Sequence, residues 1–466
     1  MRMKIVKRWF DERYRAENIV YQLPKGTLFL HSKDPKTIDS VFAITSLIGS
    51  FFNDIIEVKG GTAHFLEHIL GGRPNKTFKT KNQIDNYEFG TKKYPKIHSN
   101  AWTSRAGVIF YGTSHHKGET RLLKRIISMM EFDPEKMNKY IEKERKIILS
   151  ELGEKSKPQK NSVLQFWKFA FKDLGPEYQR YVLGTEEDIK GIATNDLQKF
   201  YKVIFNRDAV ILSLQSNLDI SEETETLLNY ADEIVFQNKN KIDKKPEEKI
   251  ENQFRYKHFF DERATNIYVE LSCFEKDLLK IDYNQRVTRI LSYNLVNYLI
   301  FEIIREKKGY VYSSEAIYNS SLLAKYNSKG ICFSTNKQNF VKALNEYFKI
   351  ISKGAENFLK TASGKNWLES QISGTIFPNT MEYDDDYGRS KASHYLEGYD
   401  IYDYSKLKKA VLKVKSNDLT NYIKKVFLDT PHLVWIQSDL NEKTIYKDFK
   451  KTDYYKYQSK LPISQP

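Results

Sequence analysis

The most informative stretch of this 466-residue chain is Gly60-Gly61-Thr62-Ala63-His64-Phe65-Leu66-Glu67-His68-Ile69-Leu70. It contains the pattern H-x-x-E-H. Residues four apart lie on one face of a helix, so the imidazoles of His64 and His68 can reach one metal ion. Glu67 projects from the same region and can hold a water molecule beside that metal. Two neutral imidazoles and a nearby carboxylate are the groups that a zinc hydrolase requires.

The spacing H-x-x-E-H is the reverse of H-E-x-x-H and is typical of the inverted zincins. The alternative is an amphipathic helix that carries two surface histidines by chance, and the rest of the chain has to decide between the two. Catalytic zinc usually has three protein ligands and one open position for water. A third ligand must therefore come from another segment.

A candidate third ligand lies in the segment Glu144-Arg145-Lys146-Ile147-Ile148-Leu149-Ser150-Glu151. Asp133-Pro134 predicts a helix start upstream, with Asp as the cap and Pro at the first helical position. Glu144 and Glu151 are seven residues apart and share a helix face. One of them can bind the metal while the other orients a ligating histidine. The alternative is that both are solvated helix surface.

Two further segments narrow the interpretation. They are Ser99-Asn100-Ala101-Trp102-Thr103-Ser104-Arg105 and Arg305-Glu306-Lys307-Lys308-Gly309-Tyr310-Val311-Tyr312. Taken with the metal motif, they resemble segments of the insulinase-like, or pitrilysin-type (M16), zinc metallopeptidases. The chain length is similar to that of the short members, which include the mitochondrial processing peptidase subunits. The resemblance extends from about Ile19 to about Leu440.

The resemblance implies a role for each residue of the metal site. His64, His68 and Glu151 would bind one Zn²⁺ ion per chain, and Glu144 would be the supporting carboxylate. Glu67 would be the general base that acts on the metal-bound water.

The resemblance also implies how a substrate is held. The segment Asn100, Ala101, Trp102 and Thr103 would be an edge strand to which an extended peptide adds as one more strand. Trp102 would line a side-chain pocket, although ordinary core packing is an equal alternative. Arg305 and Tyr312, from the other half of the molecule, would hold the substrate carbonyl and stabilise its developing negative charge.

The sequence repeats itself, which predicts two similar halves. The stretch from Thr194 to Phe205 aligns without gaps with that from Ser416 to Phe427, and Gln215-Ser216-Asn217-Leu218 aligns with Gln437-Ser438-Asp439-Leu440. We expect an α+β fold with two homologous domains, each a mainly antiparallel sheet with helices on one side, closing over a chamber. The predicted boundaries are 1–237 for the metal-binding domain, 238–252 for a charged linker and 253–466 for the second domain.

The composition adds expectations about location and partners. No stretch approaches the roughly 20 apolar residues of a membrane span, and no secretory signal is visible at the start, so a cytoplasmic location is expected. The net charge is +15, but basic residues are interspersed with acidic ones, and no nucleic-acid-binding module accompanies them. We therefore expect no specific nucleic-acid partner.

The sequence thus predicts a zinc endopeptidase that cleaves unfolded peptides or short polypeptides and works as a homodimer. Two alternatives stay open. The chain could be a dedicated processing peptidase for one peptide precursor, because the residues that perform chemistry do not encode substrate identity. It could also be a non-catalytic partner subunit of a heterodimeric peptidase, although both the metal motif and the Arg305/Tyr312 pair are present.

Overall fold

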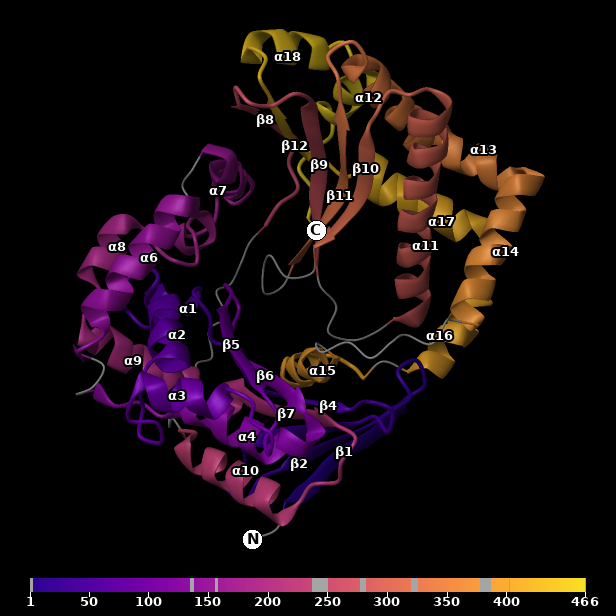
Figure 1. Cartoon of the computed structure of the whole chain (residues 1–466). Helices are drawn as coiled ribbons and strands as arrows, with labels where there is room; N and C mark the ends of the chain where they lie inside the picture. Colours follow the sequence, from indigo (N-terminus) through magenta and orange to yellow (C-terminus); the bar gives the residue numbers. More distant parts are fainter. Residues whose placement is uncertain are drawn as a thin grey trace. The chain divides into compact units, whose positions relative to one another are not determined.

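The computed structural model describes residues 3–134, 138–155, 158–236, 250–276, 282–319, 326–377, 387–401 and 403–465. The chain divides into two compact units (Figure 1). The first unit comprises Met1–Lys157, Pro176–Lys245 and Thr380–Tyr402, and the second comprises Pro158–Gly175, Pro246–Asn379 and Asp403–Pro466. Neither unit is continuous in sequence, so segments are exchanged between the two halves of the chain.

The first unit is built on a seven-stranded sheet of order β1-β2-β3-β7-β4-β6-β5, in which only the β3–β7 pair is parallel. Strand β7 is buried along its whole length, as expected for a central strand, although it includes the polar residues Ser213, Gln215 and Ser216. The strands are β1 (Lys4–Asp11), β2 (Ala16–Gln22), β3 (Leu28–Lys33), β4 (Asp39–Ser46), β5 (Ile97–Thr103), β6 (Val108–His115) and β7 (Val210–Ser216).

Helices cover both faces of this sheet. On one face, α4 packs its Leu122 and Ile126 side chains against the backbone at Gly112 of β6, and α2 lies over β5. On the opposite face, α15 packs its Ala392 against Val20, Leu30 and Ile211 (Figure 1). The helices of this unit are α1 (Phe52–Ile55), α2 (Thr62–Gly72), α3 (Lys81–Glu88), α4 (Glu119–Ile127), α6 (Ile141–Lys155), α8 (Glu186–Gly191), α9 (Thr194–Ile204), α10 (Glu222–Ile234) and α15 (Tyr387–Leu396).

The second unit repeats the core of the first. Its sheet has the order β8-β12-β9-β11-β10, which matches β3-β7-β4-β6-β5 strand for strand when each set is numbered along the chain. The single parallel pair, β8–β12, also corresponds to β3–β7. These strands are β8 (Arg255–Phe260), β9 (Ile267–Lys276), β10 (Ser313–Asn319), β11 (Tyr326–Thr335) and β12 (Leu433–Ser438). The topology agrees with the internal repeat, since the aligned segments form α9 followed by β7 and α17 followed by β12.

The helices of the second unit pack mainly on one face of its sheet. On the opposite face, α7 places Phe166 and Phe169 against Trp435 of β12. The helices are α7 (Pro158–Ala170), α11 (Tyr283–Leu299), η5 (Ile300–Lys307), α12 (Phe340–Lys349), η6 (Ile350–Gly354), α13 (Ala355–Lys360), α14 (Ala362–Ile376), α16 (Tyr404–Val411), α17 (Ser416–Ile423), η7 (Lys424–Leu428), α18 (Glu442–Phe449) and α19 (Asp453–Gln458).

The α+β class with two mainly antiparallel sheets is confirmed. The sequence-based boundaries treat each domain as one continuous stretch, whereas in the structure α7 belongs to the second unit and α15 to the first. Residues 237–249, which include most of the predicted linker 238–252, lie outside the described residues. Among the helices that are described, none combines the length and the apolar character needed to cross a membrane.

Candidate metal centre

The H-x-x-E-H pattern lies on α2, as its spacing predicts. The helix begins after Gly61, which has φ of 84°, a left-handed conformation that favours glycine. A Cβ at Gly61 would also meet the carbonyl oxygen of Leu183 at 2.0 Å. Packing and backbone conformation therefore both require glycine where the chain enters α2.

His64, Glu67 and His68 form a cluster whose potential ligand atoms lie within 4.8 Å of one another. The two imidazole rings are 4.6 Å apart between centroids, in an edge-to-face arrangement. Nε2 of His64 lies 3.9 Å from Oε2 of Glu67. The same Glu67 oxygen accepts a hydrogen bond of 3.1 Å from the Thr103 hydroxyl on β5. Thr103 therefore holds one oxygen of Glu67, which fixes the direction of the carboxylate.

Helix α6 brings both predicted glutamates to the histidines. Glu151 lies with Oε2 at 3.8 Å from Nε2 of His64 and Oε1 at 3.6 Å from Nε2 of His68. Glu144 is buried and its Oε2 lies 3.1 Å from Nδ1 of His68. The two carboxylates thus take different positions: Glu151 faces the Nε2 atoms of both rings, and Glu144 contacts the far nitrogen of one ring.

The start of the helix that carries these glutamates differs from the prediction. The Asp133-Pro134 signal predicts one helix running into Glu144, but Lys139 and Tyr140 form a turn and α6 begins at Ile141. The Tyr140 ring lies under the Arg73 guanidinium, 5.6 Å from it. This tertiary contact places the turn beside the end of α2, and local capping signals cannot report it.

The donor set fits a zinc ion. Tetrahedral coordination with bonds of about 2.0–2.1 Å places neighbouring donor atoms roughly 3.3 Å apart. The separations of 3.6 Å and 3.8 Å between Glu151 and the two Nε2 atoms are close to that value. With the Nδ1 hydrogen of His68 donated to Glu144, the Nε2 lone pair of that ring is directed to the metal position. Glu67 offers a carboxylate oxygen within 4.8 Å of a nitrogen of each ring, and Glu151 has oxygens at 3.8 Å and 3.6 Å from the two Nε2 atoms.

The predicted substrate strand is β5, which lies at the edge of the seven-stranded sheet. Its residues alternate: Ser99, Ala101 and Thr103 face α2, whereas Asn100 and Trp102 are exposed on the other face. Trp102 is 55% exposed, so it is not part of the hydrophobic core. The Asn100 side chain accepts a hydrogen bond of 2.9 Å from the Ala101 N–H.

Arg305 and Tyr312 belong to the second unit. Arg305 is in the π-helical segment η5, where its guanidinium stacks on the Phe301 ring at 5.0 Å. Gly309, with φ of 60°, ends this segment, and its N–H donates to the Arg305 carbonyl at 2.9 Å. Tyr312 comes directly before β10 and is 56% exposed. Its hydroxyl accepts a hydrogen bond from Asn336. The helix end, glycine cap and strand start that this segment predicts are all present.

Comparisons with known proteins agree with this architecture. Residues 191–360 match the family model described as the peptidase M16 inactive domain. The mitochondrial-processing peptidase subunit beta of Blastocladiella emersonii is 25% identical over 207 residues, which cover 44% of this chain and 42% of the relative. A probable mitochondrial-processing peptidase subunit beta of Arabidopsis thaliana is 27% identical over 205 residues, covering 42% of this chain and 35% of the relative. Each aligned region thus spans less than half of the relative's own length.

Solved structures share the fold over almost the whole chain. The first half of the periplasmic protease PqqL from Escherichia coli has a TM-score of 0.73 at 14% identity, covering 98% of this chain and 99% of that one. Pitrilysin has a TM-score of 0.67 at 15% identity, covering 100% of this chain and 51% of that one. The chain therefore has the two-unit fold of these proteases, and residues 191–360 resemble an M16 domain. At such identities the solved structures support the fold alone, and the activity of this chain has to be argued from its own residues.

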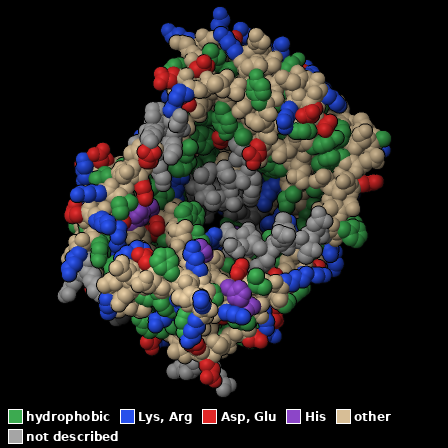
Figure 2. All heavy atoms as spheres, in the orientation of Figure 1, with side chains coloured by type: hydrophobic (Ala, Val, Ile, Leu, Met, Phe, Trp, Pro, Cys, Tyr) green, Lys and Arg blue, Asp and Glu red, His purple; other side chains and the backbone are tan. Residues whose placement is uncertain are grey.

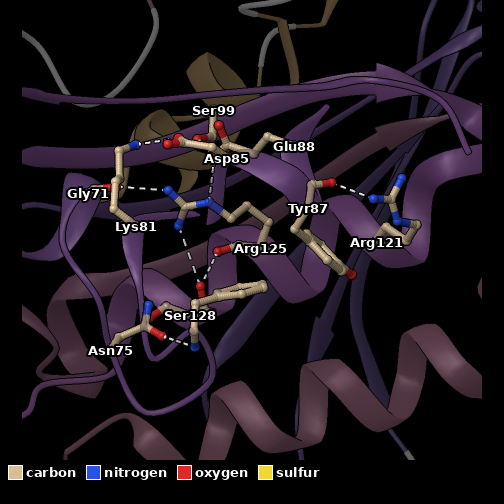
Figure 3. A network of polar contacts seen from close by, with 11 residues as sticks. Gly71, Asn75, Lys81, Asp85, Tyr87, Glu88, Ser99, Arg121, Arg125 and Ser128 are labelled. Carbon is tan, nitrogen blue, oxygen red and sulfur yellow. Dashed lines mark hydrogen bonds and ion pairs between the residues drawn. The ribbon is translucent and has the colours of Figure 1, made fainter. Parts of the chain in front are cut away.

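Three contacts around the candidate site were not foreseen from the sequence. Arg73, directly after α2, forms a close ion pair with Oε1 of Glu144. Thr103, predicted as a substrate contact, donates its hydroxyl to Glu67. Arg125 of α4 is buried and contacts the last turn of α2 (Figure 3). The sequence offers a weak signal only for Arg73, a basic residue at the C-terminus of a helix.

Proposed function

We propose that this chain is a zinc-dependent endopeptidase that cleaves unfolded peptides or short polypeptides. The observation that carries the proposal is the convergence of His64, His68 and Glu151 from two helices, with Glu67 beside them and Glu144 behind His68. Zinc bound there would polarise a scissile carbonyl and lower the pKa of a water molecule.

The side chains then perform the proton transfers. Glu67, held through Oε2 by Thr103, takes a proton from the water with its other oxygen and delivers it to the leaving amine. Glu144 keeps the His68 ring in one orientation. The backbone of β5 holds the peptide as an added strand. Arg305 and Tyr312 are proposed to face the developing oxyanion from the second unit.

The test is metal content together with hydrolysis by the purified chain. We expect about one equivalent of zinc per chain. A chelator should abolish cleavage of an unstructured peptide, and added zinc should restore it. A chain that carries zinc and cleaves no peptide under any condition would instead support the non-catalytic partner subunit.

A dedicated processing activity is the second candidate, and the relatives favour it. Two curated relatives are named as subunits of a mitochondrial-processing peptidase. A proteomic screen for cleaved substrates separates the two functions. One dominant cleavage site would indicate a dedicated peptidase, and many unrelated sites would indicate general degradation.

We also propose a homodimer as the working form. Both the metal motif and the Arg305/Tyr312 pair are on one chain, so no specialised partner is required for either. Light scattering of the active protein tests this, because full activity in a monomeric peak contradicts it.

A further inference from the structure

Arg125 connects the metal-binding helix to two neighbouring elements. Its side chain is only 2% exposed. One terminal nitrogen, Nη2, donates to the carbonyl oxygen of Gly71 in the last turn of α2 at 2.9 Å. Nε donates to Oε1 of Glu88 at 2.5 Å. Figure 3 shows the guanidinium between these groups and Ser128.

Glu88 carries the connection on to the edge strand. The same oxygen, Oε1, accepts a hydrogen bond of 2.5 Å from the hydroxyl of Ser99 on β5. Gly71 and β5 are also in direct contact, since a Cβ on Gly71 would lie 3.3 Å from the Cβ of Ala101. We call the chain of contacts from the Gly71 carbonyl through Arg125 and Glu88 to Ser99 the α2–β5 tether.

A second connection joins the same two elements. The Thr103 hydroxyl, at the end of β5, donates to Glu67 in the middle of α2. Helix α2 and strand β5 are therefore joined at two points, on either side of His68. Two separated connections fix the position of one element along the other, which a single contact cannot do.

We propose that Arg125 is a positioning residue which sets the register of β5 against α2. It acts by holding the Gly71 carbonyl and the Ser99 hydroxyl at fixed positions through one guanidinium and one carboxylate. The consequence for activity rests on the proposed function, because it assumes that a peptide backbone on β5 is presented to groups on α2.

The chemistry of the tether favours positioning over packing. A buried cation costs free energy unless it is paired and hydrogen-bonded, and an apolar side chain of similar size avoids that cost. Burial lowers the pKa of Arg125, and the Glu88 carboxylate opposes this shift. The guanidinium provides directional hydrogen bonds, because its N–H donors lie in one plane and bind their partners only at set angles. Positions of reacting groups matter to within about 1 Å in catalysis.

Hydrogen exchange of the zinc-free protein tests the tether without zinc or hydrolysis. We expect Arg125→Met to speed the exchange of backbone amides in two segments together, 69–73 and 97–103. The matched control is Arg121→Met, one turn earlier on α4. The Arg121 guanidinium contacts the carbonyls of Pro95 and Tyr87 instead. Figure 3 shows the contact with Tyr87. The control should loosen the region around 87–96 and leave the last turn of α2 unchanged.

Kinetics at saturating zinc give the second readout. Arg125→Met should lower kcat about tenfold or more, as expected for misplaced reacting groups, with a smaller change in KM. Arg125→Lys keeps the charge but not the fork of donors, so it should recover only part of kcat. Arg121→Met should cost thermal stability and leave kcat unchanged.

Ser99→Ala keeps the test decisive if Arg125→Met fails to fold. It removes one hydroxyl, leaves the Arg125–Glu88 pair in place, and should speed exchange in β5 alone while lowering kcat. The proposal is overturned if Ser99→Ala changes neither the amide exchange rates in β5 nor kcat. It is also overturned if Arg121→Met speeds exchange in α2 and β5 as much as Arg125→Met does. A wild-type chain that lacks hydrolysis refutes the proposed function and leaves the exchange result as the test of the tether.

Discussion

At the scale of single residues, the roles of Glu67 and Glu151 follow from where their oxygens lie. Both are carboxylates within 4 Å of a histidine nitrogen. Glu67 is held by Thr103 on one oxygen, whereas Glu151 has one oxygen near each imidazole. This difference supports the proposal that Glu67 is the base and Glu151 the third ligand, and each proposed role makes a separate prediction.

Glu67→Gln should keep zinc and lose hydrolysis. The amide can still accept the Thr103 hydrogen bond, but it cannot take a proton from water. The rate should therefore fall by at least about a hundredfold, the usual effect of a missing general base. Zinc content by elemental analysis and peptide turnover, measured on the same preparation, check the prediction. Near-normal turnover by Glu67→Gln would show that Glu67 is not the general base.

Glu151→Gln should weaken zinc binding, because a neutral amide is a poorer ligand than a carboxylate. Competition with a coloured chelator measures the change. Glu142→Gln, on the same helix and pairing with Arg145, is the matched control and should leave zinc affinity unchanged. If the wild type and Glu151→Gln bind zinc with equal affinity, another carboxylate must be the third ligand.

Tyr312→Phe tests the proposed oxyanion contact. The phenol hydroxyl should act mainly in the transition state, so its loss should lower kcat more than it raises KM, with zinc content unchanged. Tyr310→Phe, two residues away, is the control and should be silent. Identical kinetics for the two variants would leave Tyr312 without a role in the chemistry.

At the scale of elements, the entrance to α2 depends on one glycine. Gly61→Ala places a Cβ against the Leu183 carbonyl and forces a left-handed conformation on alanine. The conformation alone costs about 1–2 kcal/mol, and the contact adds to it. Thermal unfolding should therefore occur at lower temperature.

Gly153→Ala is the control for this effect. Gly153 is in the last turn of α6, and a Cβ there meets nothing within 4 Å. Alanine should stabilise that helix by up to about 1 kcal/mol. Opposite signs for the two glycines are expected, and a stabilising Gly61→Ala would contradict the account of how α2 begins.

At the scale of the whole molecule, the two units exchange helices, so neither half of the sequence is a complete folding unit. Residues 1–245 lack α15, which covers Val20, Leu30 and Ile211 and carries a buried network. In that network the Tyr387 hydroxyl accepts a hydrogen bond from Asn18 and donates one to Asp11, and Lys391 pairs with Asp11 at 3.0 Å.

The fragment 1–245 should therefore be poorly soluble, because it exposes an apolar sheet face. Fusing residues 380–402 to it through a flexible linker should restore a cooperative thermal transition. The same fusion with Ala392→Asp should not restore the transition, because the substitution buries a charge against the apolar sheet face. A fully folded 1–245 fragment would show that α15 is dispensable to the first unit.

The charges visible on the surface are of both signs and interspersed (Figure 2). We therefore expect the apolar sheet face, and not a patch of charge, to dominate the solubility of the fragment.

Features that depend on short-range geometry could be predicted from the amino-acid sequence. Helical spacing places His64 and His68 on one face, and the glycine at 309 ends a helix before Tyr312, whatever surrounds them. The repeat of helix and strand along the chain predicted two halves of like topology, and the matching strand orders agree with it.

Which distant groups contact one another became visible from the folded chain. That Glu151 faces both Nε2 atoms, that Arg125 reaches the Gly71 carbonyl, and that α6 begins at Ile141 all depend on how helices pack. The exchange of α7 and α15 is of the same kind. The pattern of an amphipathic helix predicts that it will pack on an apolar face. It does not predict which sheet provides that face, because the hydrophobic effect is not directional.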